Sequence, residues 1–178
     1  MNRRIILIIA LLLCVFSIKG LAQKENVIKV NLVNAFLKTP EILYEIRVNE
    51  QNSFVMSGFY TFYNPQDTQV EGWGITAEFR VYLGNSNAPA GIYIAPFGRY
   101  QNLNLISEID EPGTYASMGV GLITGYQRYI NHWLILEGFF GGGYNMGSVD
   151  AKSNPNNFLV DYYDGFVFRF GINIGFAF

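Results

Sequence analysis

The sequence has very few of the residues that carry most enzymatic and metal chemistry. Its 178 residues include one cysteine and one histidine. The cysteine, Cys14, lies inside the only long apolar run, so the rest of the chain has no thiol for a disulfide bond or a thiolate metal site. His132 stands in a short polar segment with no second histidine to assist it. We therefore expect no enzymatic activity, no bound metal and no cofactor.

Charge is scarce as well. Charged residues make up 15% of the chain and hydrophobic residues 50%, whereas soluble domains average about 25% charged residues. The basic residues do not cluster and the formal net charge is −2, which argues against a nucleic-acid partner. A chain of this composition has little charge to present to water, and it needs a place for a large apolar surface.

Only one long hydrophobic run exists, residues 5–18. Its 14 residues fall short of the length that a membrane-spanning helix needs. A basic segment precedes it at 2–4, and small residues at 20 and 22 suit cleavage before Gln23, which is the layout of a secretory signal peptide. We expect residues 1–22 to be removed on export by the Sec route and residues 23–178 to form one domain. An uncleaved N-terminal anchor is the alternative.

Beyond Gln23 the apolar residues alternate with a period of two, which is typical of strands with two different faces. The pattern is clearest in the segments that begin at Trp73 and Phe166. It predicts eight strands, at 27–36, 41–48, 53–63, 73–83, 91–102, 115–130, 133–146 and 166–178. Pro96 falls inside the fifth of these, and because proline cannot donate to a ladder we expect a bulge or a locally broken pair there.

Eight strands of about ten residues suit a tilted crossing of a bilayer, and an even number lets a meander close without a free edge. The predicted fold is all-β, an eight-stranded antiparallel up-and-down transmembrane β-barrel. The connections alternate in length. Those at 49–52, 84–90 and 131–132 are short, whereas those at 64–72, 103–114 and 147–165 are long and polar. This asymmetry is typical of outer-membrane barrels, whose long loops lie outside the cell; only the first outer loop, 37–40, is short.

Alternation alone does not separate a membrane barrel from a soluble, secreted barrel that binds an apolar ligand. Here one strand face is nearly free of charge, and the other is mostly small and polar, as a narrow interior requires. Aromatic residues gather near both strand ends, as in the girdles at membrane–water interfaces. They are Tyr60, Phe62, Trp73, Tyr100, Tyr115 and Phe166 at the outer end, and Tyr82, Tyr126, Tyr129, Trp133 and Phe178 at the inner end. The membrane barrel is the preferred interpretation, and the soluble barrel stays open.

Charged residues on the polar face form the candidate site. They are three acidic and five basic residues: Lys29, Glu45, Arg47, Glu78, Arg80, Arg99, Glu137 and Arg169. An isolated charge in a narrow interior costs several kcal/mol, so these groups must pair. Because eight strands enclose only enough space for side chains, we expect a salt-bridged plug that closes the barrel. A gated channel for ions or small solutes is the alternative.

The predicted outer loops hold most of the acidic residues: Asp67, Glu71, Glu108, Asp110, Glu111, Asp150, Asp161 and Asp164, against Lys152. Such carboxylates could share divalent cations with lipopolysaccharide or meet a basic partner. The alternative is a solvated loop surface with no specific ligand.

Finally, the chain resembles known families. Its C-terminal strand, with Phe170, Ile172, Ile174, Phe176 and the terminal Phe178, resembles the sorting signal that the barrel-assembly machinery reads. The chain after residue 22 resembles the small OmpA/OmpX-type barrels. It resembles more closely an uncharacterised family of small outer-membrane barrels, through KVNL (29–32), FYNP (62–65), AEFRVY (77–82), AGIY (90–93) and FGRY (97–100). The resemblance implies the barrel fold and a location in the lipid bilayer of a Gram-negative outer membrane, and it carries over no catalytic residue. We also expect the protein to be a monomer.

Overall fold

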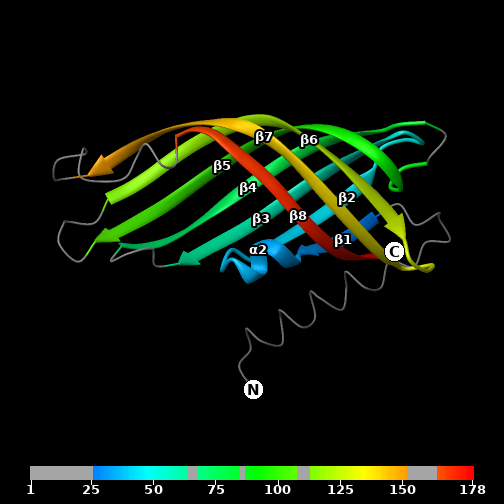
Figure 1. Ribbon diagram of the computed structural model, residues 1–178, viewed down its shortest axis with the longest axis horizontal. Coiled ribbons are helices and arrows are strands. Elements are labelled where there is room, and N and C mark those ends of the chain that lie inside the picture. The colour runs from blue at the N-terminus through cyan, green and yellow to red at the C-terminus, as the bar shows by residue number, and fades with distance from the viewer. Residues whose placement is uncertain (1–25, 64–67, 85–86, 108–112, 152–163) are drawn as a thin grey trace, which may run out of the picture.

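The computed structural model describes residues 26–63, 68–84, 87–107, 113–151 and 164–178. The expected signal peptide lies outside these residues. Eight strands carry the fold: β1 (Asn26–Asn31), β2 (Glu41–Arg47), β3 (Asn52–Tyr63), β4 (Thr68–Tyr82), β5 (Gly91–Ser107), β6 (Gly113–Tyr129), β7 (Leu134–Ala151) and β8 (Gly165–Ala177). Each pairs antiparallel with the next, and β8 pairs with β1, so the sheet closes on itself (Figure 1). The predicted all-β, eight-stranded antiparallel up-and-down barrel is confirmed.

The two ends of the barrel differ. The turn end carries the short connections 48–51, 83–90 and 130–133, and the loop end carries residues 32–40, 64–67, 108–112 and 152–164. Strand pairing reaches further toward the loop end than the sequence suggested, to Thr68–Ser107 and to Gly113–Ala151. The predicted long loops 64–72, 103–114 and 147–165 are therefore partly strand. Their apolar alternation is weak, but backbone hydrogen bonds hold a ladder together without it.

The first predicted strand, 27–36, is wrong in its second half. β1 ends at Asn31, and residues Leu32–Phe36 form a short helix, α2. The Asn31 side chain accepts from the backbone N–H of Asn34 and so caps the helix. At the other end Lys38 adopts a φ of 58°, and the N–H of Thr39 reaches the carbonyl of Asn34, which is a Schellman arrangement. No helix among the described residues is long and apolar enough to cross a membrane.

Pro96 interrupts one ladder and leaves the other intact. Between β4 and β5 the pairing runs to Glu78–Phe97 and resumes at Val81–Ile94 with the register unchanged. Between β5 and β6 Pro96 lies opposite Leu122 in a continuous ladder. Of the two expected outcomes, the locally broken pair is found and the bulge is not, because no residue is inserted. The pair is broken on the β4 side because Pro96 has no backbone N–H to donate to that strand.

Candidate functional site: the charged barrel interior

The charged side chains of the described strands lie mostly inside the barrel. Lys29, Glu45, Glu78, Arg80 and Glu137 point inward and are at most 2% exposed. Arg169 is 7% exposed, and the outward-facing residues between them are large and hydrophobic. Charged residues are rarely fully buried in soluble domains, whereas here they lie inside together with apolar residues such as Val55, Phe97 and Ile123. The interior is therefore the part of the molecule whose chemistry needs explanation.

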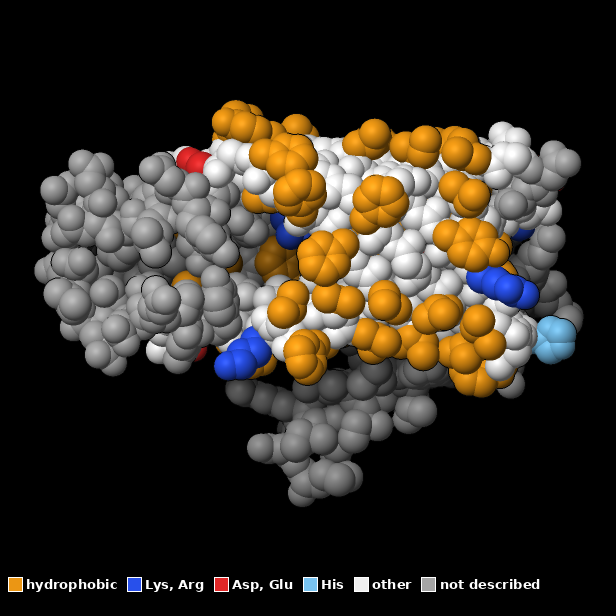
Figure 2. Space-filling model, in the orientation of Figure 1, with side chains coloured by type: hydrophobic (Ala, Val, Ile, Leu, Met, Phe, Trp, Pro, Cys, Tyr) orange, Lys and Arg blue, Asp and Glu red, His pale blue; other side chains and the backbone are white. Residues whose placement is uncertain are grey.

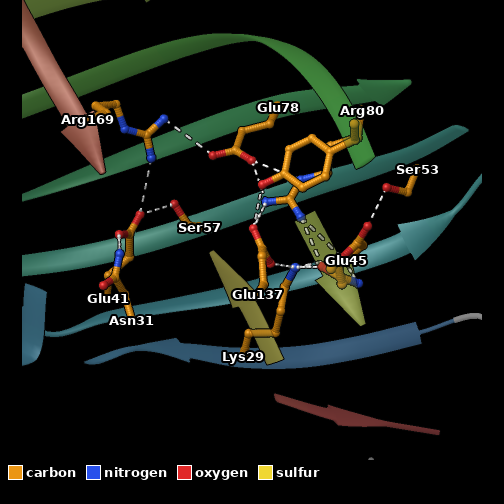
Figure 3. A network of polar contacts seen from close by, with 12 residues as sticks. Lys29, Asn31, Glu41, Glu45, Ser53, Ser57, Glu78, Arg80, Glu137 and Arg169 are labelled. Carbon is orange, nitrogen blue, oxygen red and sulfur yellow. Dashed lines mark hydrogen bonds and ion pairs between the residues drawn. The ribbon is translucent and has the colours of Figure 1, made fainter. Parts of the chain in front are cut away.

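Four side chains from β1, β2, β4 and β7 form the central cluster: Lys29, Glu45, Arg80 and Glu137. The Lys29 ammonium pairs with Glu45 at 2.7 Å and also with Glu137 (Figure 3). Arg80 pairs with Glu137 at 3.0 Å and lies 3.5 Å from Glu45. Its guanidinium also stacks over the Tyr93 ring, 4.4 Å from the centroid. Within these four residues, each carboxylate thus meets two cations and each cation meets two carboxylates.

Neutral donors complete the central cluster. The hydroxyls of Tyr82 and Tyr93 donate to Glu45 and Glu137 at 2.7 and 2.6 Å, and the Ser53 hydroxyl also donates to Glu45. The Gln127 amide oxygen accepts from Lys29 at 2.8 Å and from Arg80 at 3.2 Å. These bonds satisfy the remaining polar atoms, which a buried ionic group requires.

A second group, the loop-side cluster, lies nearer the loop end and consists of Glu41, Arg99 and Arg169. Arg169 lies 3.8 Å from Glu41, and Arg99 lies 4.0 Å from the same oxygen. Glu78 joins the two clusters, because one of its oxygens lies 3.3 Å from Arg169 and the other 2.8 Å from Arg80 (Figure 3). These charged groups therefore form one connected network.

Glu41 is the member that sequence reasoning missed. It is 1% exposed and accepts from Ser57 at 2.7 Å and from Asn34 of α2 at 2.7 Å. Its position has the same parity as Leu43 and Glu45, and this signal was available. Glu41 was not assigned to the interior because it is the first residue of β2, and an acidic residue at the end of a strand is usually solvated.

Arg47 is the predicted residue that the structure places at the rim of the barrel. It is the last residue of β2, is only half-buried, and its Nε donates to the carbonyl of Asn49 in the turn at 3.1 Å. With Glu41 added and Arg47 at the rim, the enclosed charges are four acidic and four basic rather than three and five. The interior is formally neutral.

Three residues assigned to the aromatic girdles also point inward. Tyr129 is half-buried and packs against the interior residues Val27, Ile135 and Ala177, and the other two are fully buried. Tyr82 and Tyr115 are 2% and 0% exposed. Tyr82 belongs to the central cluster, and the Tyr115 hydroxyl donates to Asp164 at 2.6 Å. The position of all three near strand ends suggested an interface, but the parity of their strands directs these side chains into the barrel.

The longest connection at the turn end reaches into the barrel. Ala88 and Pro89 are buried, and Ala88 packs with Tyr82, Tyr93 and other interior residues. The Pro89 carbonyl accepts from Gln127 of the central cluster. Residues 88 and 89 therefore cover part of the central cluster at this end of the barrel.

Of the predicted acidic loop residues, Asp67, Glu108, Asp110, Glu111 and Asp161, as well as Lys152, lie outside the described residues, and the side chain of Asp150 is not described. Glu71 belongs to β4 rather than to a loop and accepts from Gln69. Asp164 accepts from Tyr115. Among the described residues no group of three or more potential metal ligands occurs.

The residues of the predicted sorting signal lie on the last strand and its terminus. Phe170, Ile172, Ile174 and Phe176 face outward and are 36–59% exposed. Phe178 lies beyond the strand, where its backbone N–H donates to Asn26 at 3.0 Å and its carbonyl accepts from Asn26 at 3.3 Å. The terminal residue therefore helps to join β8 to β1.

Residues 6–157 match the family described as "Protein of unknown function (DUF3575)". The chain belongs to this family. The family description names no activity, so membership adds no catalytic or binding role to the residues above. No curated protein and no solved structure matches the chain. An assignment to the OmpA/OmpX-type barrels thus has no support beyond the resemblance and the shared barrel architecture.

Proposed function

We propose that this protein is an integral outer-membrane β-barrel with a closed, salt-bridged interior and a structural or surface-interaction role. In this proposal residues 1–22 direct Sec export and are removed, the barrel-assembly machinery inserts the chain, and it stays a monomer. The observation that carries the proposal is the composition of the outward face. Among the described side chains, that face has two charged groups, Glu71 near the loop end and Arg128 near the turn end.

The rest of the exposed wall is mostly apolar, with exposed large hydrophobic side chains on every strand. The most exposed large side chains of the strands include Phe168 at 79%, Phe140 at 67% and Met118 at 65%. Figure 2 shows hydrophobic side chains over the described part of the visible wall, with basic side chains mainly toward its two ends. Monomers in water rarely expose apolar patches above several hundred Å². Acyl chains are the solvent that such a wall fits.

Aromatic pairs near the two ends give further support. Trp73 and Tyr100 lie with ring centroids 5.7 Å apart toward the loop end, and Trp133 and Phe176 lie 5.6 Å apart at the turn end. Trp and Tyr favour the membrane–water interface because their rings are apolar and their N–H and O–H groups are polar. The soluble ligand-binding barrel is disfavoured for the opposite reason: its interior would need to be apolar, and here it is ionic.

Cell fractionation combined with heat-modifiability on a gel tests the proposal. We expect the protein in the outer-membrane fraction, lacking residues 1–22, as a compact band that shifts only after boiling. Recovery in the periplasm without detergent would overturn the membrane proposal. The sharing of divalent cations between the acidic loop residues and lipopolysaccharide is tested separately. Removal of those cations should weaken the binding of lipopolysaccharide to the protein.

A narrow channel is the second candidate, because the interior is polar along most of its length. Planar-bilayer recording with the purified protein separates the two. The closed barrel predicts no steady openings, and conducting events that disappear in Arg99→Ala or Glu137→Ala would establish the channel instead.

A further inference from the structure

The wall of the barrel is incomplete in its loop-end half. β1 has six residues and β8 has 13. Pairing between them begins at Val27–Ala177 and stops at Asn31–Asn173. Within the part of the chain that the structure describes, residues 165–172 of β8 pair with β7 alone. The backbone groups on the other edge of this segment face the gap, and such an edge is costly in hydrocarbon unless something covers it.

The helix α2 lies in this gap but does not fill it. It contacts β8, yet none of its five residues is buried, and Phe36 is 88% exposed. Asn34 ties the helix to Glu41 of the loop-side cluster. Between β8 and α2, Figure 2 shows a recess in the surface, with a basic side chain visible inside it. The interior is thus accessible from the side of the barrel.

The loop-side arginines lie close to α2, because both approach Glu41, which accepts from Asn34 of this helix. Arg99 is the most accessible cation of the network, with 19% of its side chain exposed against 0% for Lys29 and Arg80. Its Nε donates to Thr76 at 3.1 Å, and its guanidinium lies over the Phe59 ring, 4.7 Å from the centroid. A guanidinium has five N–H donors, and for Arg99 this is the one hydrogen bond to the described residues. Arg169 belongs to the part of β8 that pairs with β7 and not with β1.

The surface outside the recess is strongly apolar. Phe166, Phe168 and Phe170 follow one another on the outward face of the same part of β8 and are 65%, 79% and 59% exposed. Together with Phe36 of α2 they line both sides of the gap. A cationic recess bordered by an apolar stripe matches a molecule with an anionic head and a hydrocarbon tail.

We propose that this gap binds a single-chain anionic amphiphile from the bilayer, with its carboxylate or phosphate at Arg99 and Arg169 and its chain along the phenylalanines of β8. The proposal rests on the proposed membrane location. The ligand competes with Glu41, whose carboxylate stays 3.8–4.0 Å from both arginines and is held mainly by neutral donors.

The test uses the mature protein in phosphatidylcholine vesicles with photoreactive palmitate, followed by peptide mapping. We expect saturable labelling on α2 and on residues 165–172. Unlabelled palmitate or palmitoyl lysophosphatidic acid should displace it, and whichever acid competes better identifies the head group. Palmitoylglycerol, which has the same chain and no charge, should not compete. Even labelling around the wall, or equal competition by palmitoylglycerol, would overturn the proposal.

Arg99→Gln should weaken palmitate binding at least about tenfold, since a hydrogen bond to a charged group is lost. Arg128→Gln is the matched control: it removes an outward-facing positive charge near the turn end and should leave binding unchanged. Both variants are first checked for the compact heat-modifiable band. If two copies of the protein cross-link along β8, a second protein chain covers the gap and the lipid proposal is wrong. Diffuse labelling of a protein that still fractionates with the outer membrane would contradict this inference alone, and not the membrane proposal.

Discussion

Glu137 shows at the level of one residue how the interior stays ionised. One of its oxygens pairs with Lys29, and the other accepts from Tyr93 at 2.6 Å and lies 3.0 Å from Arg80. Removing a carboxylate from water costs several kcal/mol, and attraction to two cations offsets this only while the geometry is kept. Loss of a single partner therefore leaves uncompensated charge in a site that water does not reach.

Glu137→Ala should lower the free energy of unfolding by about 3–5 kcal/mol, because Lys29 and Arg80 both lose a partner. Urea titration in lipid vesicles, followed by tryptophan fluorescence, measures the change. Glu50→Ala is the control, since Glu50 is exposed in a turn and should change stability by less than about 0.5 kcal/mol. A loss below about 1 kcal/mol in Glu137→Ala would contradict the description of the central cluster as an essential ionic network.

Alternation predicts which residues point inward, but not how they pair. The parity of each strand was enough to select Lys29, Glu45 and Glu137 from the sequence. The partners depend on the stagger between strands, so the contacts of Gln127 with Lys29 and Arg80 could not be predicted. Position along the strand was also hidden, and for that reason Arg47 was placed in the network and Glu41 was not.

At the scale of elements, β6 and β7 depend on glycine where their backbones approach closely. A Cβ at Gly141 would collide with the carbonyl oxygen of Leu122 and with the Cα of Ile123. A Cβ at Gly138, three residues earlier on the same strand, would meet nothing within 4 Å. Glycine thus has two roles in one strand: it permits close packing inside, and it leaves an open outward position.

Gly141→Ala should cost about 1–3 kcal/mol of stability, because backbone atoms rather than a flexible side chain must move. Gly138→Ala should be neutral or stabilising by about 0.4–1 kcal/mol, since alanine restricts the unfolded chain. The two variants are compared by urea unfolding under one set of conditions. Equal stabilities would mean that the close approach of β6 and β7 is not needed.

The error in the first strand also belongs to this scale. Hydrophobic residues recur along the whole of segment 27–36, and their alternation with polar residues is lost only after Asn31. The local signals for a helix were an asparagine able to cap it and Pro40 shortly after its end. They are weak in a segment of five residues, since so short a helix is stable only through contacts such as that of Asn34 with Glu41.

At the scale of the whole molecule, closure depends on the joint between the first and last strands. This ladder has five residue pairs, as few as the ladder between β1 and β2, and the backbone of Phe178 extends it by two hydrogen bonds to Asn26. The Phe178 ring also lies 6.5 Å from that of Tyr44 and 6.3 Å from that of Phe176. These contacts assign Phe178 a part in the stability of the joint, in addition to the predicted sorting signal.

Deletion of Phe178 should lower the amount of folded protein in the outer membrane strongly, whereas Phe178→Tyr should keep it near the normal amount. Phe178→Ala keeps the backbone bonds and removes the ring, so it separates the two roles. Assembly is measured by the heat-modifiable band in the membrane fraction. Normal levels of the deletion variant would contradict the sorting-signal prediction.

The apolar wall leads to a prediction that depends on the solvent of the whole molecule. Val120 faces outward on β6, well inside the strand, and is 64% exposed; Ile130 is 55% exposed and lies just beyond the same strand at the turn end. In water an arginine at either position would reach solvent and cost little. In a bilayer the depth of the two positions differs, and a charge is costly only where the surroundings are hydrocarbon.

We therefore expect Val120→Arg to lower the free energy of unfolding from phosphatidylcholine vesicles by about 2–4 kcal/mol, and Ile130→Arg by about 0–1 kcal/mol. The natural Arg128, which faces outward two residues from Ile130, already indicates that the turn end accepts a positive charge. Paired urea titrations of the two variants give the difference directly. If both substitutions cost the same small amount, the wall does not contact acyl chains, and its exposed phenylalanines would need a protein partner to cover them.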